Sequence, residues 1–399
     1  MSNCKLSCPM KLNDYINEKI DPLFQKGGKY EKLWALYDSF HTFLFVPRHT
    51  AARKGVQVHD SVDSKRVIMT VIIALIPALL VGLWNVGYQH DLALGINDGW
   101  FMQFLYGLVA FLPKVVVSYV VGLGIEMTVA CIKREEVAEG FLATGLLIPM
   151  VVPVNTPLWM IAVATAFSVI FAKEIFGGTG MNIFNPALIT RAFLFFAYPK
   201  AMSGDEVFVR TGSALCNSPI EGTAVVDGFS GATPLAAVAD GTFNPATYST
   251  IDAFLGCIPG SIAETSTLAI LLGACLLLVT KVASWRIMCS VFAGGAIMSA
   301  IIATFSENAP TVAQQLCLGG FAFAAVFMAT DPVTGCRTNT GKYIYGLFIG
   351  VMAILIRMFN TGYPEGAMMA VLLGNACAPL IDYCVINSNI SKRAKRVNA

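Results

Sequence analysis

The sequence contains few charged residues for its length. Its 399 residues include 27 Lys and Arg and 25 Asp and Glu, which is 13%, whereas soluble domains carry about 25%. Hydrophobic residues make up 56% of the chain, so disorder is excluded and a single soluble core could not bury so much apolar surface. The composition therefore predicts a membrane protein that crosses the bilayer several times. The net charge of +2 gives no reason to expect a nucleic-acid partner.

Residues that bind haem iron or iron–sulfur clusters are also scarce. All four histidines lie in the first 90 residues, which excludes a bis-histidine haem inside the membrane part. The eleven cysteines include no Cys-x-x-Cys pair, and most are expected to be small buried hydrophobic residues. We therefore expect no iron–sulfur cluster held by this chain alone, and no metal site other than one for sodium.

The charged residues divide the chain into regions. Residues 1–66 hold 18 of the 52 charges, and residues 67–90 hold none. A stripe of apolar residues at helical spacing, which includes Trp34 and Tyr37, predicts an amphipathic helix in the N-terminal segment. The expected parts are a cytoplasmic extension (1–66), a first membrane repeat (67–199), a loop on the periplasmic side (200–266), a second membrane repeat (267–386) and a basic cytoplasmic tail (387–399).

The apolar stretches predict an all-α membrane fold of about ten transmembrane helices. The third and fifth stretches are short and bounded by proline, as expected of broken or half helices. Five helices in each half would invert the second half, and a repeated Gly-Phe to Pro-Val spacing supports such an inverted repeat. The stretches are 67–88, 104–132, 140–153, 157–176, 186–199, 267–281, 287–305, 311–330, 343–359 and 366–386.

The distribution of Lys and Arg among the loops predicts the orientation in the membrane. With the N-terminus in the cytoplasm, the cytoplasmic loops and tail hold most of these residues, whereas the opposite loops hold only Lys200 and Arg210. The chain start lacks the basic stretch and apolar run of a signal peptide. We therefore expect both termini in the cytoplasm.

One motif lies in the long polar loop. It runs from Asp227 to Thr233 and places Ser230, Gly231 and Ala232 directly before the threonine. Small neighbours would leave the Thr233 hydroxyl accessible, although composition alone describes an ordinary Gly/Ser loop. The order of the residues resembles the Asp-x-x-Ser-Gly-Ala-Thr acceptor motif, at which a flavin transferase attaches FMN to threonine through a phosphoester bond.

With this motif the whole chain resembles a known family, the B subunits of the bacterial sodium-translocating NADH:quinone oxidoreductase. Further resembling stretches are 136–144, 173–198, 258–267 and 373–383. The D subunit of the Rnf electron-transport complex is also similar in its acceptor motif, but it lacks the long N-terminal extension. Both families imply a fold like that of urea and ammonium channels, with paired five-helix repeats.

The resemblance implies a redox subunit of an enzyme that pumps sodium out of the cell through the bacterial inner membrane. Its cofactors would be covalent FMN and riboflavin, and its substrates ubiquinone and sodium. Electrons would pass from NADH through other subunits to the FMN of the C subunit, then to the FMN on Thr233, a riboflavin and ubiquinone. The implied partners are the other members of a six-subunit complex (A, C, D, E and F), a flavin transferase for maturation, and membrane lipid.

Several residues acquire roles from the resemblance. Two asparagines, Asn182 and Asn185, match the riboflavin contacts of the family, and their side-chain amides are suited to the edge of a flavin ring. The alternative for Asn185 is a helix cap before Pro186. Arg191 lies inside an apolar stretch, where an unpaired charge is costly. It is expected either to balance a reduced flavin or to satisfy a carbonyl cluster.

The remaining candidates concern quinone and sodium. Quinone binding is expected at Glu139, Gly140 and Phe141, with Trp34 closing over the ring, although helix packing through glycine explains this segment equally well. Asp382 and Glu126 are the candidates for a sodium pathway, because hard oxygen ligands suit a hard cation. The competing functions are an Rnf D subunit and a flavin-free solute channel of the same fold.

Overall fold

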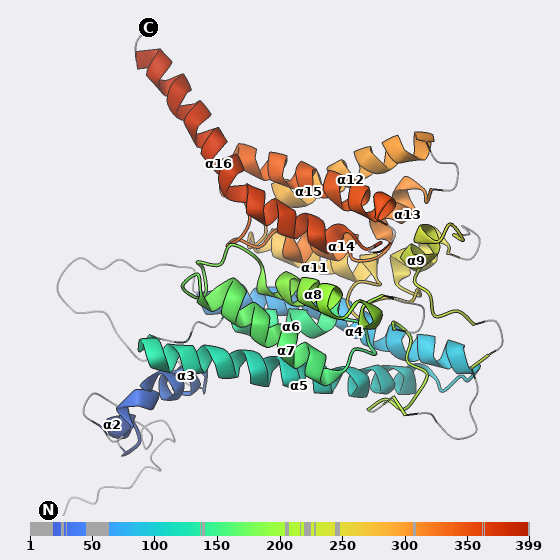
Figure 1. Cartoon of the computed structure of the whole chain (residues 1–399), viewed down its shortest axis with the longest axis horizontal. Helices are drawn as coiled ribbons and strands as arrows, with labels where there is room; N and C mark the ends of the chain where they lie inside the picture. The colour runs from blue at the N-terminus through green and yellow to red at the C-terminus, as the bar shows by residue number, and fades with distance from the viewer. Residues whose placement is uncertain are drawn as a thin grey trace, which may run out of the picture.

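The computed structural model describes residues 19–24, 28, 30–44, 64–135, 137, 140–203, 207–215, 217–218, 225–226, 229–243, 248–305, 309–360, 362 and 364–397. All regular structure in these ranges is helical (Figure 1). The N-terminal part contains α2 (Asp21–Phe24), η1 (Glu31–Leu33) and α3 (Trp34–Leu44). The first apolar half contains α4 (Ser64–Leu94), α5 (Trp100–Lys133), α6 (Phe141–Val151), α7 (Leu158–Ser168), η2 (Val169–Glu174), α8 (Pro186–Ala197) and η3 (Pro199–Ala201).

The second half of the chain follows a segment with short helices. These are α9 (Pro234–Ala239) and α10 (Thr250–Leu255). The helices after them are α11 (Thr267–Val279), α12 (Trp285–Phe305), α13 (Val312–Cys317), α14 (Phe321–Phe323), η4 (Ala324–Met328), α15 (Asn339–Phe359) and α16 (Ala367–Val397).

Among the described residues, five helices are long and apolar enough to cross a membrane: α4, α5, α12, α15 and α16. Three shorter apolar helices, α6, α8 and α11, have 11 to 13 residues. The chain is therefore a multi-pass membrane protein, as predicted, and the short helices lie in segments where the sequence predicts spans. One predicted stretch, 311–330, is not a single helix but the pieces α13, α14 and η4, interrupted at Leu318–Gly320 where Gly319 has a φ of 61°.

Local capping explains where several helices begin. Asn185 caps α8 through its side-chain oxygen, with Pro186 at the first helical position. Ser266 and Thr338 cap α11 and α15 in the same way, and Thr311 forms a capping box with Gln314 at α13. Each cap satisfies a backbone N–H that would otherwise have no partner at the helix start.

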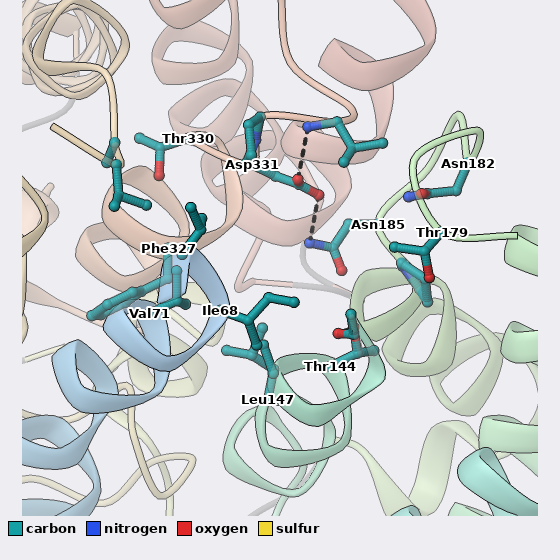
Figure 2. A pocket seen from close by; sticks show the side chains of 18 of the residues that line it. Ile68, Val71, Thr144, Leu147, Thr179, Asn182, Asn185, Phe327, Thr330 and Asp331 are labelled. Carbon is teal, nitrogen blue, oxygen red and sulfur yellow. Dashed lines mark hydrogen bonds between the residues drawn. The ribbon is translucent and has the colours of Figure 1, made fainter. Parts of the chain in front are cut away.

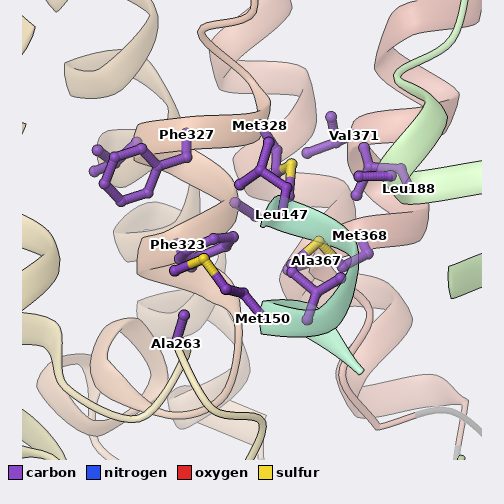
Figure 3. Packing of buried hydrophobic residues seen from close by; sticks show 14 of the residues in the cluster. Leu147, Met150, Leu188, Ala263, Phe323, Phe327, Met328, Ala367, Met368 and Val371 are labelled. Atoms are coloured by element: carbon purple, nitrogen blue, oxygen red, sulfur yellow. The ribbon is translucent and has the colours of Figure 1, made fainter. Parts of the chain in front are cut away.

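The core lies where the two halves meet. Side chains of the short helix α6, including Leu147 and Met150, pack against Phe323, Phe327 and Met328 of α14 and η4, and residues of α8 and α16 join them (Figure 3). Lys114 of α5 donates to the carbonyls of Pro153 and Val154 just after α6 (2.6 and 2.5 Å). A cation there compensates the negative C-terminal pole of a helix that ends inside the protein.

Different elements lie at the two ends of the helix bundle. In Figure 1, α2, α3 and the C-terminal part of α16 lie toward the left, whereas α9 lies toward the right. Between these ends α4 packs against α5 and α11, and α15 packs against α12 and α16. The N-terminal helix α3 contacts α5.

Candidate functional site

The loop between η2 and α8 is shaped by glycine. Gly177, Gly178 and Gly180 have φ values of 114°, 93° and 93°, a region that side chains with a Cβ rarely adopt. This conformation turns the chain sharply after η2 and leads it into the cap of α8. Asn182 and Asn185 follow this turn on the same loop.

The two asparagines make different contacts. The Asn182 amide donates to the carbonyl of Phe184 (3.0 Å). Asn185 accepts from Ala187 N–H (3.0 Å), so it is the helix cap that the sequence offers as the alternative. Its amide also donates to the Asp331 carboxylate (3.3 Å), which belongs to the turn after η4. Asn185 thus connects the two halves of the chain.

A cavity of about 380 Å³ opens beside these asparagines. Figure 2 shows Asn182 and Thr179 on one side of the cavity and Phe327 and Val71 on the other. Asp331 lies between these two groups. The wall is mainly apolar and is formed by Val67, Ile68, Val71, Gly140, Ala143, Thr144, Leu147, Lys173, Thr179, Asn182, Asn185, Pro186, Leu277, Val282, Ala283, Phe327, Thr330, Asp331, Pro332 and Val333. An apolar cavity with a few converging polar groups is typical of a small-molecule site.

The Asp331 carboxylate is well supplied with donors. It accepts from Val333 N–H (3.0 Å), from the Thr334 hydroxyl (3.1 Å) and from Asn185. Burial raises the pKa of this carboxyl above its ordinary value, and these hydrogen bonds oppose the rise. The residue therefore organises the turn after η4, as expected of an acid before proline.

The structure separates the predicted quinone residues. Gly140 lines the cavity, where a Cβ on it would lie 2.7 Å from the methyl group of Thr179. Phe141 is instead fully buried against α5, with its ring edge-on to Tyr119 at 6.4 Å. Trp34 belongs to α3, and Glu139 lies outside the described residues. Of this set, only Gly140 is placed beside the riboflavin candidates.

The Glu126 carboxylate is engaged in an ion pair. It forms a buried ion pair with Lys173 of η2. Lys173 lines the large cavity and also a second cavity of about 200 Å³, which Glu126, Glu135 and Glu174 line as well. The pair therefore separates an apolar cavity from a more polar one.

Asp382 also has several hydrogen-bond donors. It accepts from the backbone N–H of Arg337 (2.7 Å) and from the N–H and hydroxyl of Thr338 (3.1 and 2.5 Å). These donors belong to the start of α15, so the carboxylate holds α16 against that helix. Its role in a sodium pathway stays a prediction.

Thr233 lies at the other end of the bundle, where it caps α9. Its hydroxyl oxygen accepts from Ala236 N–H (3.2 Å), and the side chain is half-buried. Ser230 accepts from Ala232 N–H (3.3 Å), which shapes the turn before it. Asp227 lies outside the described residues. The threonine is therefore not the merely exposed loop residue that the sequence predicts.

Arg191 lies apart from the two asparagines. It forms a buried ion pair with Glu264, just before α11, and a second ion pair with Glu365, which is partly exposed just before α16. The sequence indicates that this arginine needs a partner, but neither acid is identified in advance because both lie far along the chain. Arg357, in the last turn of α15, donates to the carbonyls of Gln315 and Leu318 (2.6 and 3.0 Å) and so supports the end of α13.

Comparison with known proteins identifies relatives of this chain. Residues 51–391 match the NQR2, RnfD, RnfE family. The chain belongs to this family. It is 41% identical to the B subunit of the Na(+)-translocating NADH-quinone reductase of Azotobacter vinelandii, and 42% identical to the proteins of that name from Ectopseudomonas mendocina and Stutzerimonas stutzeri. Each match covers 95% of this chain and 98% of the relative. The predicted resemblance is confirmed.

Proposed function

We propose that this chain is the flavin- and quinone-binding membrane subunit of a sodium-translocating NADH:quinone reductase. The observation that carries the proposal is the 380 Å³ cavity, in which Asn182, Asn185 and Gly140 meet. Its volume lies in the range of small-molecule sites, and its apolar walls suit a flat ring. The names of the relatives support the activity, and their coverage supports extending it to the whole chain.

The residues present fit a riboflavin in this cavity. Asn182 and Asn185 bring amide groups to the wall, and the Lys173 ammonium, which is paired with Glu126, lies at another part of it. Valine, leucine and phenylalanine side chains between them exclude water. A bound flavin supplies one-electron transfer, and the chain orients its ring and sets the charge around it. Ubiquinone approaches this cavity from the side of Gly140.

The second flavin is an FMN held by Thr233 as a phosphodiester. The small residues Gly231 and Ala232 precede the hydroxyl, and the helix α9 fixes its position. Electrons enter here from the flavinylated C subunit of the same complex. The complex lies in the bacterial inner membrane, with ten spans in two inverted repeats, both termini of this chain cytoplasmic, and sodium moving outward along a path that includes Glu126 and Asp382.

The riboflavin assignment is tested with Asn182→Ala in the purified complex. The Asn182 amide donates to the nearby Phe184 carbonyl, whereas the α8 cap is Asn185, so this change removes an amide from the cavity without removing the cap. We expect released, non-covalent flavin to fall several-fold while covalent FMN stays constant. Flavin is measured by fluorescence after acid precipitation of the protein.

The matched control is Asn360→Ala, which removes an exposed amide at the end of α15, outside the cavity. It should retain full riboflavin. An assembled Asn182→Ala complex with undiminished riboflavin would place that flavin elsewhere.

The family also contains RnfD, so an Rnf D subunit is the second candidate. The extended N-terminal segment and the names of the relatives favour the B subunit of the NADH:quinone reductase. A complex that oxidises NADH directly with quinone as acceptor supports the first function, and one that requires ferredoxin supports the second. A colourless protein would instead indicate a flavin-free channel.

A further inference from the structure

The ion-pair network around Arg191 joins two acidic side chains to one basic side chain. One guanidinium is paired with two carboxylates, those of Glu264 and Glu365. The side chains of Arg191 and Glu264 are 1% and 2% exposed, and that of Glu365 is 15% exposed. With both acids ionised the three groups sum to −1, and a net charge in such a buried place is costly unless something balances it.

Two buried oxygen atoms of this region have no hydrogen-bond partner among the described residues. They are Oε2 of Glu264 and the hydroxyl oxygen of Thr265, whose residue is also 2% exposed. Buried polar atoms in native proteins nearly always have a partner, which is either protein, water or an ion. An unpaired carboxylate oxygen is the more costly of the two. A bound species beside Glu264 and Thr265 would give both oxygen atoms a partner.

A small cavity lies beside these atoms. It measures about 20 Å³ and is lined by Glu264, Glu365, Ser261, Thr265 and Thr233, together with neighbouring residues. This volume holds one water molecule or one ion without its hydration shell. The side-chain groups around it are carboxylates and hydroxyls, the oxygen ligands that hard cations prefer. Water would satisfy the oxygen atoms but would leave the negative charge. A proton on Glu264 would remove the charge but would leave the Thr265 hydroxyl oxygen without a partner. A monovalent cation does both.

We propose that Glu264, Glu365, Ser261 and Thr265 bind one sodium ion beside Thr233. The choice of sodium rests on the proposed function, whereas the site itself rests on the charge, the unpaired oxygen atoms and the cavity. Because Thr233 lines the same cavity, the ion interacts with any charge attached to that residue. Sodium occupancy and the redox state of a flavin on Thr233 are therefore coupled, and each changes the free energy of the other.

The test is equilibrium binding of ²²Na⁺ to the purified, sodium-depleted complex. In Glu264→Gln the amide oxygen still accepts from Arg191, but the network becomes neutral. We expect this variant to bind one sodium ion fewer per complex than the native complex. Asp98→Asn is the control, because Asp98 is an exposed acid between α4 and α5 and lines neither this cavity nor the two larger ones. It should retain the native number of ions. Equal sodium binding by native and Glu264→Gln complexes would overturn the site.

A measurement on the unaltered complex makes the result independent of how the variant folds. Thallium replaces sodium, and an electron-density or cryo-electron-microscopy map is compared with one obtained in choline. A thallium peak among Glu264, Glu365 and Thr265 is expected. Infrared absorption of a protonated Glu264 carboxyl at saturating sodium, with no thallium peak, would show that a proton balances the charge and would overturn the proposal. Failure of the proposed function would appear separately, as a complex that moves no sodium while still binding thallium here.

Discussion

At the scale of the single residue, Thr233 uses one oxygen for two purposes. The hydroxyl oxygen caps α9 by accepting from Ala236 N–H, and the proposed FMN would be attached through the same atom. Thr233→Ala should therefore abolish the covalent flavin and also weaken α9 locally by about 1 kcal/mol, the usual value of a lost cap. Thr233→Ser keeps an oxygen for both purposes and should retain partial labelling. In-gel fluorescence and mass mapping of the peptide spanning residues 227–240 measure the outcome.

The control for Thr233 is another cap in the same segment. Ser249 caps α10 by accepting from Ile251 N–H (3.2 Å), so Ser249→Ala removes a comparable hydrogen bond and leaves Thr233 intact. The Ser249→Ala variant should retain the covalent flavin. Loss of the label in both variants would mean that labelling depends on the folding of the segment, and an unmodified Thr233 peptide from active complex would contradict the attachment.

The site residues show what sequence reasoning can and cannot reach. Asn185 is predictable as a helix cap because its partner, Ala187 N–H, is only two residues away. The bond from Asn185 to Asp331 is not predictable, because it joins positions 146 residues apart. The same holds for Arg191 and Glu264, which are 73 residues apart. A motif, or the energetic cost of burying a charge, indicates that a residue has a role. Its partner depends on how the two halves of the chain pack.

At the scale of the helix, the Lys173–Glu126 pair fixes η2 to α5. Both side chains are buried, so removing one partner leaves an unpaired charge. Lys173→Met should lower the free energy of unfolding by about 3–5 kcal/mol, whereas the double variant Lys173→Met, Glu126→Leu should recover much of this loss. Thermal unfolding of the purified complex, followed by loss of assembly, measures the effect.

The comparison pair lies on the neighbouring surface. Lys133 and Glu174 are 3.4 Å apart, and Lys133 is exposed, so Lys133→Met should change stability by less than about 1 kcal/mol. If the double variant at Lys173 and Glu126 is as unstable as Lys173→Met alone, the loss arises from packing around Lys173 and not from the uncompensated carboxylate.

Helices were predictable where composition alone determines them. The long apolar stretches coincide with α4, α5, α12, α15 and α16, because twenty apolar residues in sequence have few alternatives to a helix in lipid. The prediction of one span over 311–330 was wrong, because this stretch is not a single helix. It contains Gln314, Gln315 and the pair Gly319-Gly320, and at Gly319 the Leu235 side chain occupies the space that a Cβ would need. A contact of this kind is not visible in the pattern of one segment.

At the scale of the whole molecule, the two halves make one site that neither contains alone. The large cavity has Asn182 and Asn185 from the first half and Phe327 and Asp331 from the second. The Arg191 network likewise joins α8 to residues before α11 and α16. These two sites lie in separate parts of the bundle, with the core of α6, α14 and η4 also formed between the halves.

The orientation of this bundle determines the side from which each site is reached. The C-terminal part of α16 and the helix α3 lie at one end of the molecule, and α9 lies at the other (Figure 1). Lys392, Arg393 and Lys395 belong to the first of these ends, and positive residues stay in the cytoplasm during insertion. A reporter fused after residue 399 should therefore be active only in the cytoplasm, as should one inserted after Arg134, whereas a reporter near Gly222 should be active only outside. Activity of the Gly222 and C-terminal reporters on the same side would contradict both the ten-span arrangement and the placement of Thr233 opposite the chain termini.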